Sequence, residues 1–80
     1  MNLNSDGVFI GVNTGQGQRG AYYNISVMSD GEPYRLNATA EAYNIAKDFE
    51  FGTECRFTIA ARLYDRSWIL RIVDINYLES

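Results

Sequence analysis

The chain has 80 residues and a formal net charge of −3, and 46% of its residues are hydrophobic. This length predicts one domain spanning residues 1–80, and the apolar fraction excludes an intrinsically disordered chain. No apolar run approaches the roughly 18 residues of a membrane span, and the polar start is not that of a signal peptide, so we expect a cytoplasmic protein without a membrane partner.

The first predicted strand covers residues 8–12, and its alternate apolar residues are expected on one side of the sheet: Val8, Ile10 and Val12. Gly11 within this strand predicts a bulge or a sharp bend, which small barrels use to close. Residues 13–20 are polar and rich in glycine. They are predicted to form a flexible loop.

The second strand is predicted over residues 21–28, with three residues directed into the core: Tyr23, Ile25 and Val27. Asp30-Gly31 in the segment that follows is typical of a tight hairpin turn. The third strand begins at Pro33, a position where a proline is tolerated. Its alternation directs three residues inward: Tyr34, Leu36 and Ala38.

The period of the apolar pattern then changes from two to that of a helix. Apolar residues at i, i+3, i+4 and i+7 predict one stripe about two turns long: Ala42, Ile45, Ala46 and Phe49. Asn37 or Thr39 could cap the start of this helix. Gly52 ends the segment.

Two long strands complete the chain. In the fourth strand alternate residues are predicted to face inward: Cys55, Phe57, Ile59, Ala61 and Leu63. Residues 65–67 form a turn, and the fifth strand is predicted over residues 68–77. The side on which its apolar residues fall changes midway, which predicts a bulge near Ile72.

Three strands, one short helix and two further strands form the order of a mainly β, five-stranded Greek-key barrel of the OB type. An SH3-like barrel would have no helix in the middle, and a ferredoxin-like fold would need a second helix. OB barrels often bind oligonucleotides on one open face, between the loop that joins strands 1 and 2 and the loop that joins strands 4 and 5.

Residues 15–20 match the G-x-G-x-x-G pattern of dinucleotide-binding sites. That site requires a helix directly after the glycines, whose N-terminus holds the pyrophosphate, and a strand follows here instead. The segment is therefore read as the loop between the first two strands. Arg19 is its only charged residue.

Arginines and aromatic residues that face away from the predicted core could line a nucleic-acid-binding groove: Arg19, Tyr22, Arg35, Arg62, Tyr64, Arg66 and Trp68. Aromatic rings stack on bases, and arginine pairs with phosphate. Each residue also has a structural interpretation. Tyrosine is common on half-buried sheets, and Trp68 could cap the barrel. Arg56 and Arg71 could pair with neighbouring acidic residues, Glu54 or Asp74.

Seven basic residues stand against ten acidic ones. This balance disfavours nucleic-acid binding, because phosphate contacts supply most of the non-specific affinity. Six of the seven are arginines, however, and many of the acidic residues fall in predicted turns or in the helix. A locally positive face is thus compatible with an acidic chain.

Side chains suited to catalysis are scarce. The chain has no histidine, and Cys55 is its one cysteine. A single cysteine excludes an internal disulfide and a cysteine metal site, and its alternating neighbours are typical of a buried strand position. We therefore predict no enzymatic activity, no cofactor and no metal site.

Three segments, at residues 7–15, 30–37 and 68–75, carry a resemblance across nearly the whole chain. They resemble the small OB-fold single-stranded-DNA-binding proteins of bacteriophages and mobile elements, including the filamentous-phage replication type. The phrase Gly31-x-Pro33-Tyr34-x-Leu36-Asn37 is the best match. The resemblance implies a DNA contact for Tyr34, whereas strand alternation directs Tyr34 inward.

The resemblance also implies a homodimer that coats single strands without sequence preference. We therefore predict non-specific binding of single-stranded DNA, with RNA left open, in the replication or protection of phage or mobile-element DNA. The alternative is a small β-barrel protein-interaction module, an accessory or inhibitory factor. The acidic chain would then suit a basic protein partner.

Overall fold

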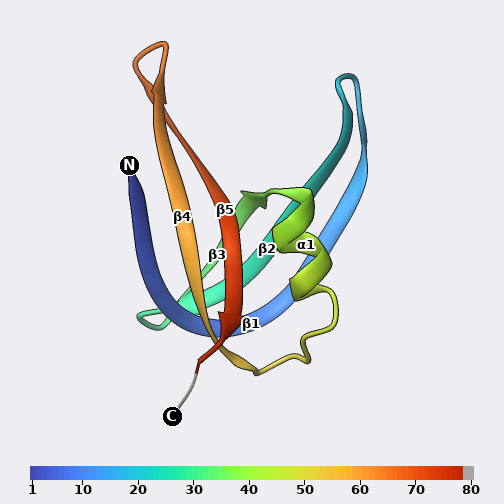
Figure 1. The fold of residues 1–80 in the computed structure, drawn as a ribbon, viewed down its shortest axis with the longest axis vertical. Coiled ribbons are helices and arrows are strands. Elements are labelled where there is room, and N and C mark those ends of the chain that lie inside the picture. Colours follow the sequence, from blue (N-terminus) through green and yellow to red (C-terminus); the bar gives the residue numbers. More distant parts are fainter. Residues whose placement is uncertain (79–80) are drawn as a thin grey trace.

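A computed structural model describes residues 1–78 and contains the predicted elements in the predicted order (Figure 1). Their bounds are β1 Asn2–Gly17, β2 Gly20–Ser29, β3 Glu32–Ala38, α1 Ala40–Ala46, β4 Glu54–Tyr64 and β5 Ser67–Tyr77. The strands close into a barrel in the order β1-β2-β3-β5-β4. Every pairing is antiparallel except that of β3 with β5. The predicted OB-like barrel, with one helix between the third and fourth strands, is confirmed.

Strand β1 is much longer than expected and belongs to two pairings. Its first half pairs with β4, from Asn2↔Ala60 to Val8↔Glu54, and its second half pairs with β2 as far as Gly17↔Gly20. The prediction of a flexible loop over residues 13–20 is therefore wrong. Most of that segment is strand, held by backbone hydrogen bonds that need no apolar side chains.

A bulge in β1 changes which of its residues face the core. Phe9 lies opposite Val27 and Gly11 lies opposite Ser26, so Ile10 is the extra residue. This confirms the bulge expected at Gly11. The expected apolar side is wrong before the bulge, where Phe9 is 3% exposed and Val8 is 36% exposed, and right beyond it for Val12, which lies opposite Ile25 and packs against the core. One extra residue reverses the alternation beyond it.

The other turns and irregularities match the sequence prediction more closely. Asp30 and Gly31 have φ of 52° and 78°, so a two-residue turn joins β2 to β3. The second bulge lies in β5, where Thr58↔Asp74 is followed by Ile59↔Ile72. The bulge predicted near Ile72 is thus confirmed.

Helix α1 closes one end of the barrel. Thr39 caps it, since the backbone N–H of Ala42 donates to Thr39 Oγ1 at 3.1 Å. The predicted place of Ile45 in the apolar stripe is wrong, because this side chain is 41% exposed. The buried face includes Ala42 and the half-buried Tyr43, and its centre lies about 100° around the helix from Ile45.

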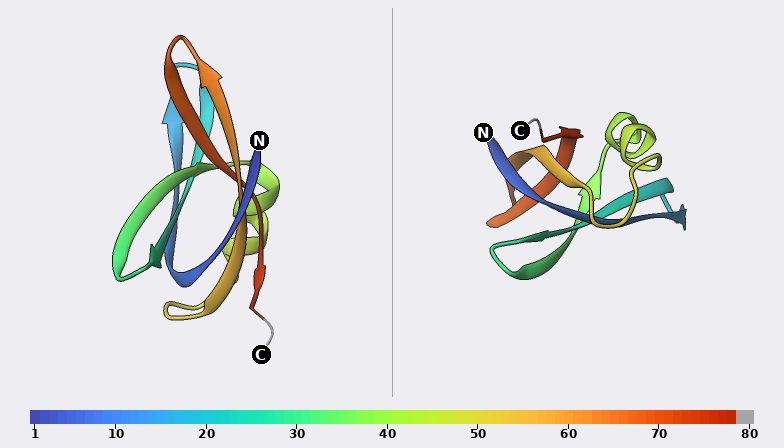
Figure 2. Two further views of the ribbon diagram at one scale, coloured as in Figure 1. Left: turned by 90° about the vertical axis from the view of Figure 1, so that its left-hand side faces the viewer. Right: turned by 90° about the horizontal axis from the view of Figure 1, so that it is seen from below.

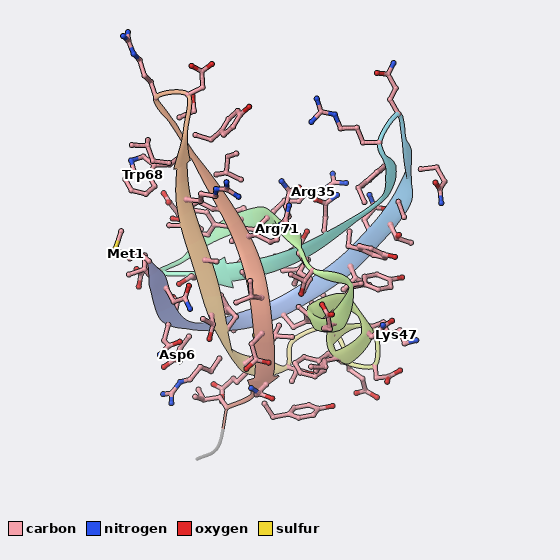
Figure 3. All side chains as sticks on the ribbon, turned by 45° about the horizontal axis from the view of Figure 1, so that its top comes forward. Met1, Asp6, Arg35, Lys47, Trp68 and Arg71 are labelled. Carbon is pink, nitrogen blue, oxygen red and sulfur yellow. The ribbon has the colours of Figure 1, made fainter. Side chains whose placement is uncertain are left out.

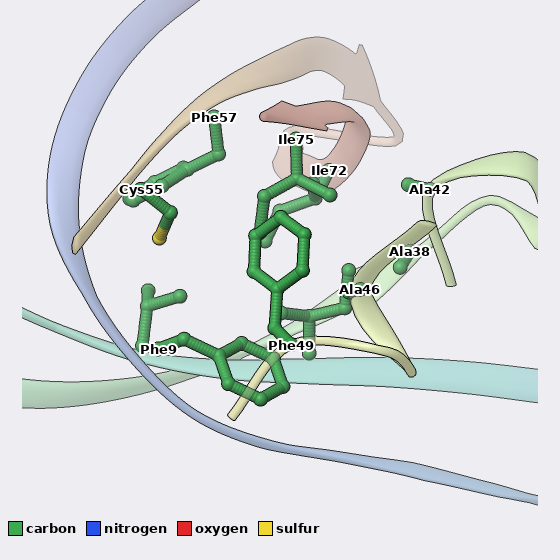
Figure 4. Close-up of a cluster of buried hydrophobic side chains, with 11 residues drawn as sticks. Phe9, Ala38, Ala42, Ala46, Phe49, Cys55, Phe57, Ile72 and Ile75 are labelled. Carbon is green, nitrogen blue, oxygen red and sulfur yellow. The ribbon is translucent and has the colours of Figure 1, made fainter. Parts of the chain in front are cut away.

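The core fills the barrel between α1 and the strands (Figure 4). Phe9 and Phe49 meet edge to face, with ring centroids 5.5 Å apart. Cys55 is fully buried and free, and desolvation raises the pKa of its thiol to about 11. The core residues are Phe9, Ile25, Val27, Ala38, Ala42, Ala46, Phe49, Cys55, Phe57, Ile72 and Ile75.

Two hairpins extend beyond the barrel and rise at the top of Figure 1. We call them the β1–β2 arm (residues 13–23) and the β4–β5 arm (residues 62–69). Barrel pairing of β2 with β3 starts at Asn24↔Asn37, and that of β5 with β3 starts at Asn37↔Arg71. Each arm is therefore a two-stranded ribbon. Across residues 1–78, no helix is long and apolar enough to cross a membrane.

Candidate nucleic-acid interface

A groove lies between the two arms on the outer face of the barrel. It consists of two adjoining cavities of about 540 and 500 Å³, which share Thr39 and Arg71. The first is bordered by the β4–β5 arm and by Arg19 from the tip of the β1–β2 arm. The second is bordered by Tyr22 of the β1–β2 arm and by the junction of β3 with α1. We call this region the inter-arm groove.

Strand register explains why its floor carries polar side chains. Asn37 lies opposite Asn24 on β2 and opposite Arg71 on β5. Residues opposite one another share a face of the sheet, and residues two apart on a strand do too. Arg35 and Asn37 therefore face outward together with Arg71. Figure 3 shows Arg35 and Arg71 near each other between the arms.

The β4–β5 arm contributes the adjacent wall. Arg71 pairs with Ala60, Ile69 pairs with Arg62, and Tyr64 continues the same face two residues later. Tyr64 is 63% exposed, so its ring is available for stacking. Arg66 occupies the tip of this arm, with φ of 66°, and does not border the groove cavities.

A glycine positions the aromatic side chain on the opposite wall. Gly15 lies opposite Tyr22, and a Cβ built at Gly15 would overlap the phenol ring. The ring of Tyr22 thus lies over the bare backbone of Gly15 and remains 44% exposed. This glycine belongs to the segment that matches G-x-G-x-x-G. Its role here is to make space for an aromatic ring.

Within residues 1–78, the arginines of the groove form no ion pair. Among residues 1–78, the one ion pair joins Arg56 Nε to Asp6 Oδ1 at 2.9 Å, away from the groove. It lowers the pKa of Asp6, mainly through the hydrogen bond from Arg56, and raises that of Arg56. The expected pairing of Arg56 with Glu54 is therefore wrong. Arg71, expected to pair with Asp74, also has no such partner.

Besides Arg66, two further predicted site residues lie outside the groove. Trp68 pairs with Leu63 and so occupies the face of the β4–β5 arm opposite to the Arg62–Ile69 pair. In Figure 3 Trp68 lies on the far side of the arm from Arg35 and Arg71. Trp68 is 58% exposed, so it does not cap the barrel by burial either.

Tyr34 follows the predicted strand alternation and is nevertheless exposed, and its predicted DNA contact stays a prediction. It lies opposite Val27, a core residue, so its alternation is inward, yet it is 45% exposed because the barrel is open at that end. Its hydroxyl donates to Glu32 at 3.1 Å, and this bond raises the pKa of Tyr34. The structure does not bring Tyr34 into the inter-arm groove.

Of the eight predicted residues, four border the groove cavities, Arg19, Tyr22, Arg62 and Tyr64, and Arg35 lies on the adjoining outward face of β3. Arg71 is the residue that the sequence prediction missed. It lies at the centre of the groove because β5 pairs in parallel with β3. The alternation of residues around Arg71 indicates only that it faces outward. Its pairing partner, Asn37, is far away in the sequence, so no local pattern places Arg71 in the groove.

The arrangement offers cationic and aromatic groups to one extended ligand. Three arginines and two exposed tyrosines border the cavities from both arms and from the floor, with Glu41 at one end. The described residues contain no group of three or more side chains placed to hold a metal ion. The chemistry of the groove suits binding of a polyanion that has flat bases.

No protein-family model matches the chain, and no curated protein matches it either. Among solved structures, the chain is similar to the dimeric N-terminal domain of the PriB protein from Thermoanaerobacter tencongensis. The two are 19% identical, with a TM-score of 0.56, and the match covers 99% of this chain and 97% of the other. This similarity supports the OB-like fold over the whole chain.

Proposed function

We propose that this protein binds single-stranded DNA without sequence preference in the inter-arm groove. The observation that carries the proposal is the convergence, on one face of an OB-like barrel, of exposed tyrosines and of arginines that form no ion pair within residues 1–78. The acidic chain as a whole argues for a basic partner. The cationic groove argues for a polyanion at this face.

Each group has a defined part in binding. Tyr22 and Tyr64 stack on bases from opposite walls, and stacking tolerates every base because each has a π-face. The arginines pair with phosphates, and the release of counterions makes the affinity depend on salt. A duplex keeps its bases stacked inside, so it cannot offer them to the tyrosines. The groove therefore selects the single strand.

Two finer parts of the proposal have separate support. A homodimer is implied by the resemblance to the phage proteins, and the similar PriB domain is described as dimeric. Action on phage or mobile-element DNA during replication rests on that resemblance alone. RNA would satisfy the same stacking and phosphate contacts, so it is the competitor to include in every binding assay.

The experiment is fluorescence anisotropy of a labelled oligothymidine at low and moderate salt, with a duplex of equal length beside it. We expect tight, salt-sensitive binding to the single strand only. Arg71→Ala should weaken binding by about tenfold, the loss of one charged hydrogen bond. Arg56→Ala is the matched control, because Arg56 is engaged by Asp6 outside the groove. Failure to bind at low salt would retire the proposal.

A second candidate function is a protein-interaction module. The observation that favours it is the row of exposed apolar side chains that runs from the open end of the barrel onto the β4–β5 arm, where Leu63 and Trp68 lie. Such surfaces commonly mark protein contacts. This surface lies on the other side of the β4–β5 arm from the groove, so both functions can coexist.

A further inference from the structure

The barrel is closed by α1 at one end and open at the other, near the β2–β3 turn. The right panel of Figure 2 shows α1 and this turn at opposite ends. An apolar cavity of about 280 Å³ opens between the turn and β5, and Tyr34, Leu36, Ile59 and Leu70 contribute to its lining.

Large apolar side chains surround this cavity and remain exposed. Leu3 pairs with Ile59, and Leu63 pairs with Trp68, so both pairs continue the inward face of the barrel beyond its mouth. We call the exposed set the mouth surface. Its members, with their exposed fractions, are Leu3 49%, Tyr34 45%, Leu63 58%, Trp68 58% and Leu70 39%.

The area of the mouth surface matches what a stable dimer needs. Five side chains of this size at about half exposure present on the order of 500 Å² of mainly apolar surface. A standard interface buries about 800 Å² per partner, and homodimer interfaces are about 65% apolar. The mouth surface would supply nearly all of that apolar share. The largest apolar patch of a typical monomer is about 300–600 Å², so this area is at the upper end.

The chemistry of the surface favours a second copy of the same chain. None of its five members is charged, and the inward-facing positions between them, Ser5, Leu36, Ile59 and Ala61, are uncharged as well. The nearest carboxylates stand at its rim, where Asp30 borders the cavity and Glu32 accepts the hydrogen bond from Tyr34. A two-fold dimer places the same patch on both sides, so an uncharged apolar patch complements itself.

We propose that the chain forms a two-fold homodimer through the mouth surface, with Leu63 and Trp68 of each copy buried at the contact. This inference rests on the homodimer part of the proposed function and assigns its interface. The inter-arm groove lies on the other face of the β4–β5 arm and stays accessible in such a dimer. Burial of Leu63 and Trp68 would also brace the arm that presents Arg62 and Tyr64.

The test is sedimentation velocity over a concentration series, with emission of the single tryptophan as a second readout. We expect a dimer for the wild type and a red shift of Trp68 emission on dilution. Leu63→Glu should weaken association by roughly 100-fold or more, because a charged carboxylate of each copy would be buried in the apolar contact. Trp68→Ser should act in the same direction. Both positions are exposed in the monomer, so folding should persist and is checked by circular dichroism.

Phe51→Glu is the matched control, since Phe51 is 81% exposed in the loop between α1 and β4. It should remain dimeric. A wild type that is monomeric at every concentration, or a dimer unaffected by both mouth substitutions, would overturn the inference. Oligonucleotide binding by a monomeric wild type would leave the DNA proposal intact while this one fails. A mouth-dependent dimer that binds no oligonucleotide would give the reverse result.

Discussion

Asn37 of β3 lies opposite Arg71 of β5 in the short parallel pairing that closes the barrel. This contact brings together two segments that are more than thirty positions apart in the sequence. It extends the outward face of β2 and β3 onto β5, where Arg71 meets the β4–β5 arm. The inter-arm groove is continuous only because of this closure.

The space beside Tyr22 gives a sharp test of the β1–β2 arm. A Cβ at Gly15 would overlap the Tyr22 ring, whereas one at Gly17 would meet its nearest neighbours at 3.7 Å or more. Gly15→Ala should therefore displace the ring and weaken oligothymidine binding about as much as Tyr22→Ala does, at most by one stacking contact of about 1–3 kcal/mol. Gly17→Ala should bind as the wild type does. Equal affinities for the two glycine variants would argue against stacking on Tyr22.

The salt dependence of binding should count the arginines that contact phosphate. Arg62→Ala removes one cation from the groove, so the slope of log K against log salt should become shallower by about 0.7. The measurement is an anisotropy titration at four or more salt concentrations. Arg56→Ala, outside the groove, should leave the slope unchanged. An unchanged slope for Arg62→Ala would remove this residue from the contact set.

Trp68 should report assembly and remain insensitive to stacking. It lies on the face of the β4–β5 arm away from Arg62, so a base bound in the groove cannot stack on it. Saturating oligothymidine should leave its emission largely unquenched, while the tyrosine variants lose affinity. Strong quenching at saturation, at a protein concentration where the oligomeric state is constant, would place the strand on the mouth surface.

The Asp6–Arg56 pair should make a small, pH-dependent contribution to stability. The hydrogen bond from Arg56 lowers the pKa of Asp6 in the folded protein below its unfolded value. The stabilisation is therefore fully present above the pKa that Asp6 has in the unfolded chain. It is lost as the pH falls through the pKa that Asp6 has in the folded protein. In urea unfolding, the free energy of unfolding of the wild type should exceed that of Asp6→Asn at pH 7, and the two values should converge in acid. A gap that stays constant down to the lowest pH would mean that the pair is not its source.

The sequence predicted correctly those elements that have one apolar face and one polar face. Alternation in β2 placed Ile25 and Val27 inward correctly, and the helical stripe found the buried Ala42 and Ala46. The extent of β1 was missed because residues 13–17 lie in an arm with solvent on both faces, where no alternation is required. The bulge at Ile10 reverses the alternation, so Val12 was placed inward correctly, whereas before the bulge Phe9 faces the core in place of Val8.

The site was predicted in its composition and only partly in its geometry. Arg62 and Tyr64 were placed correctly on the outer face, while Trp68 was grouped with them. A two-residue turn at Asp65 and Arg66 pairs Leu63 with Trp68, and that pairing puts the tryptophan on the inner side. The sequence was interpreted as a turn of three residues, 65–67, and this interpretation does not predict the pairing of Leu63 with Trp68. The position of Arg71 depends on a parallel contact that no local pattern reports.

Each arm is a ribbon of two strands, which are hydrogen-bonded to each other and to no third strand of the barrel. Opening such a ribbon costs only its own hydrogen bonds, whereas opening the barrel costs the whole core. Amide protons at the arm tips should therefore exchange with solvent orders of magnitude faster than those of Ile25 or Ile72. In the proposed complex with single-stranded DNA, the walls of the groove would adjust to successive nucleotides of uneven size while the floor keeps its register, which suits binding without sequence preference.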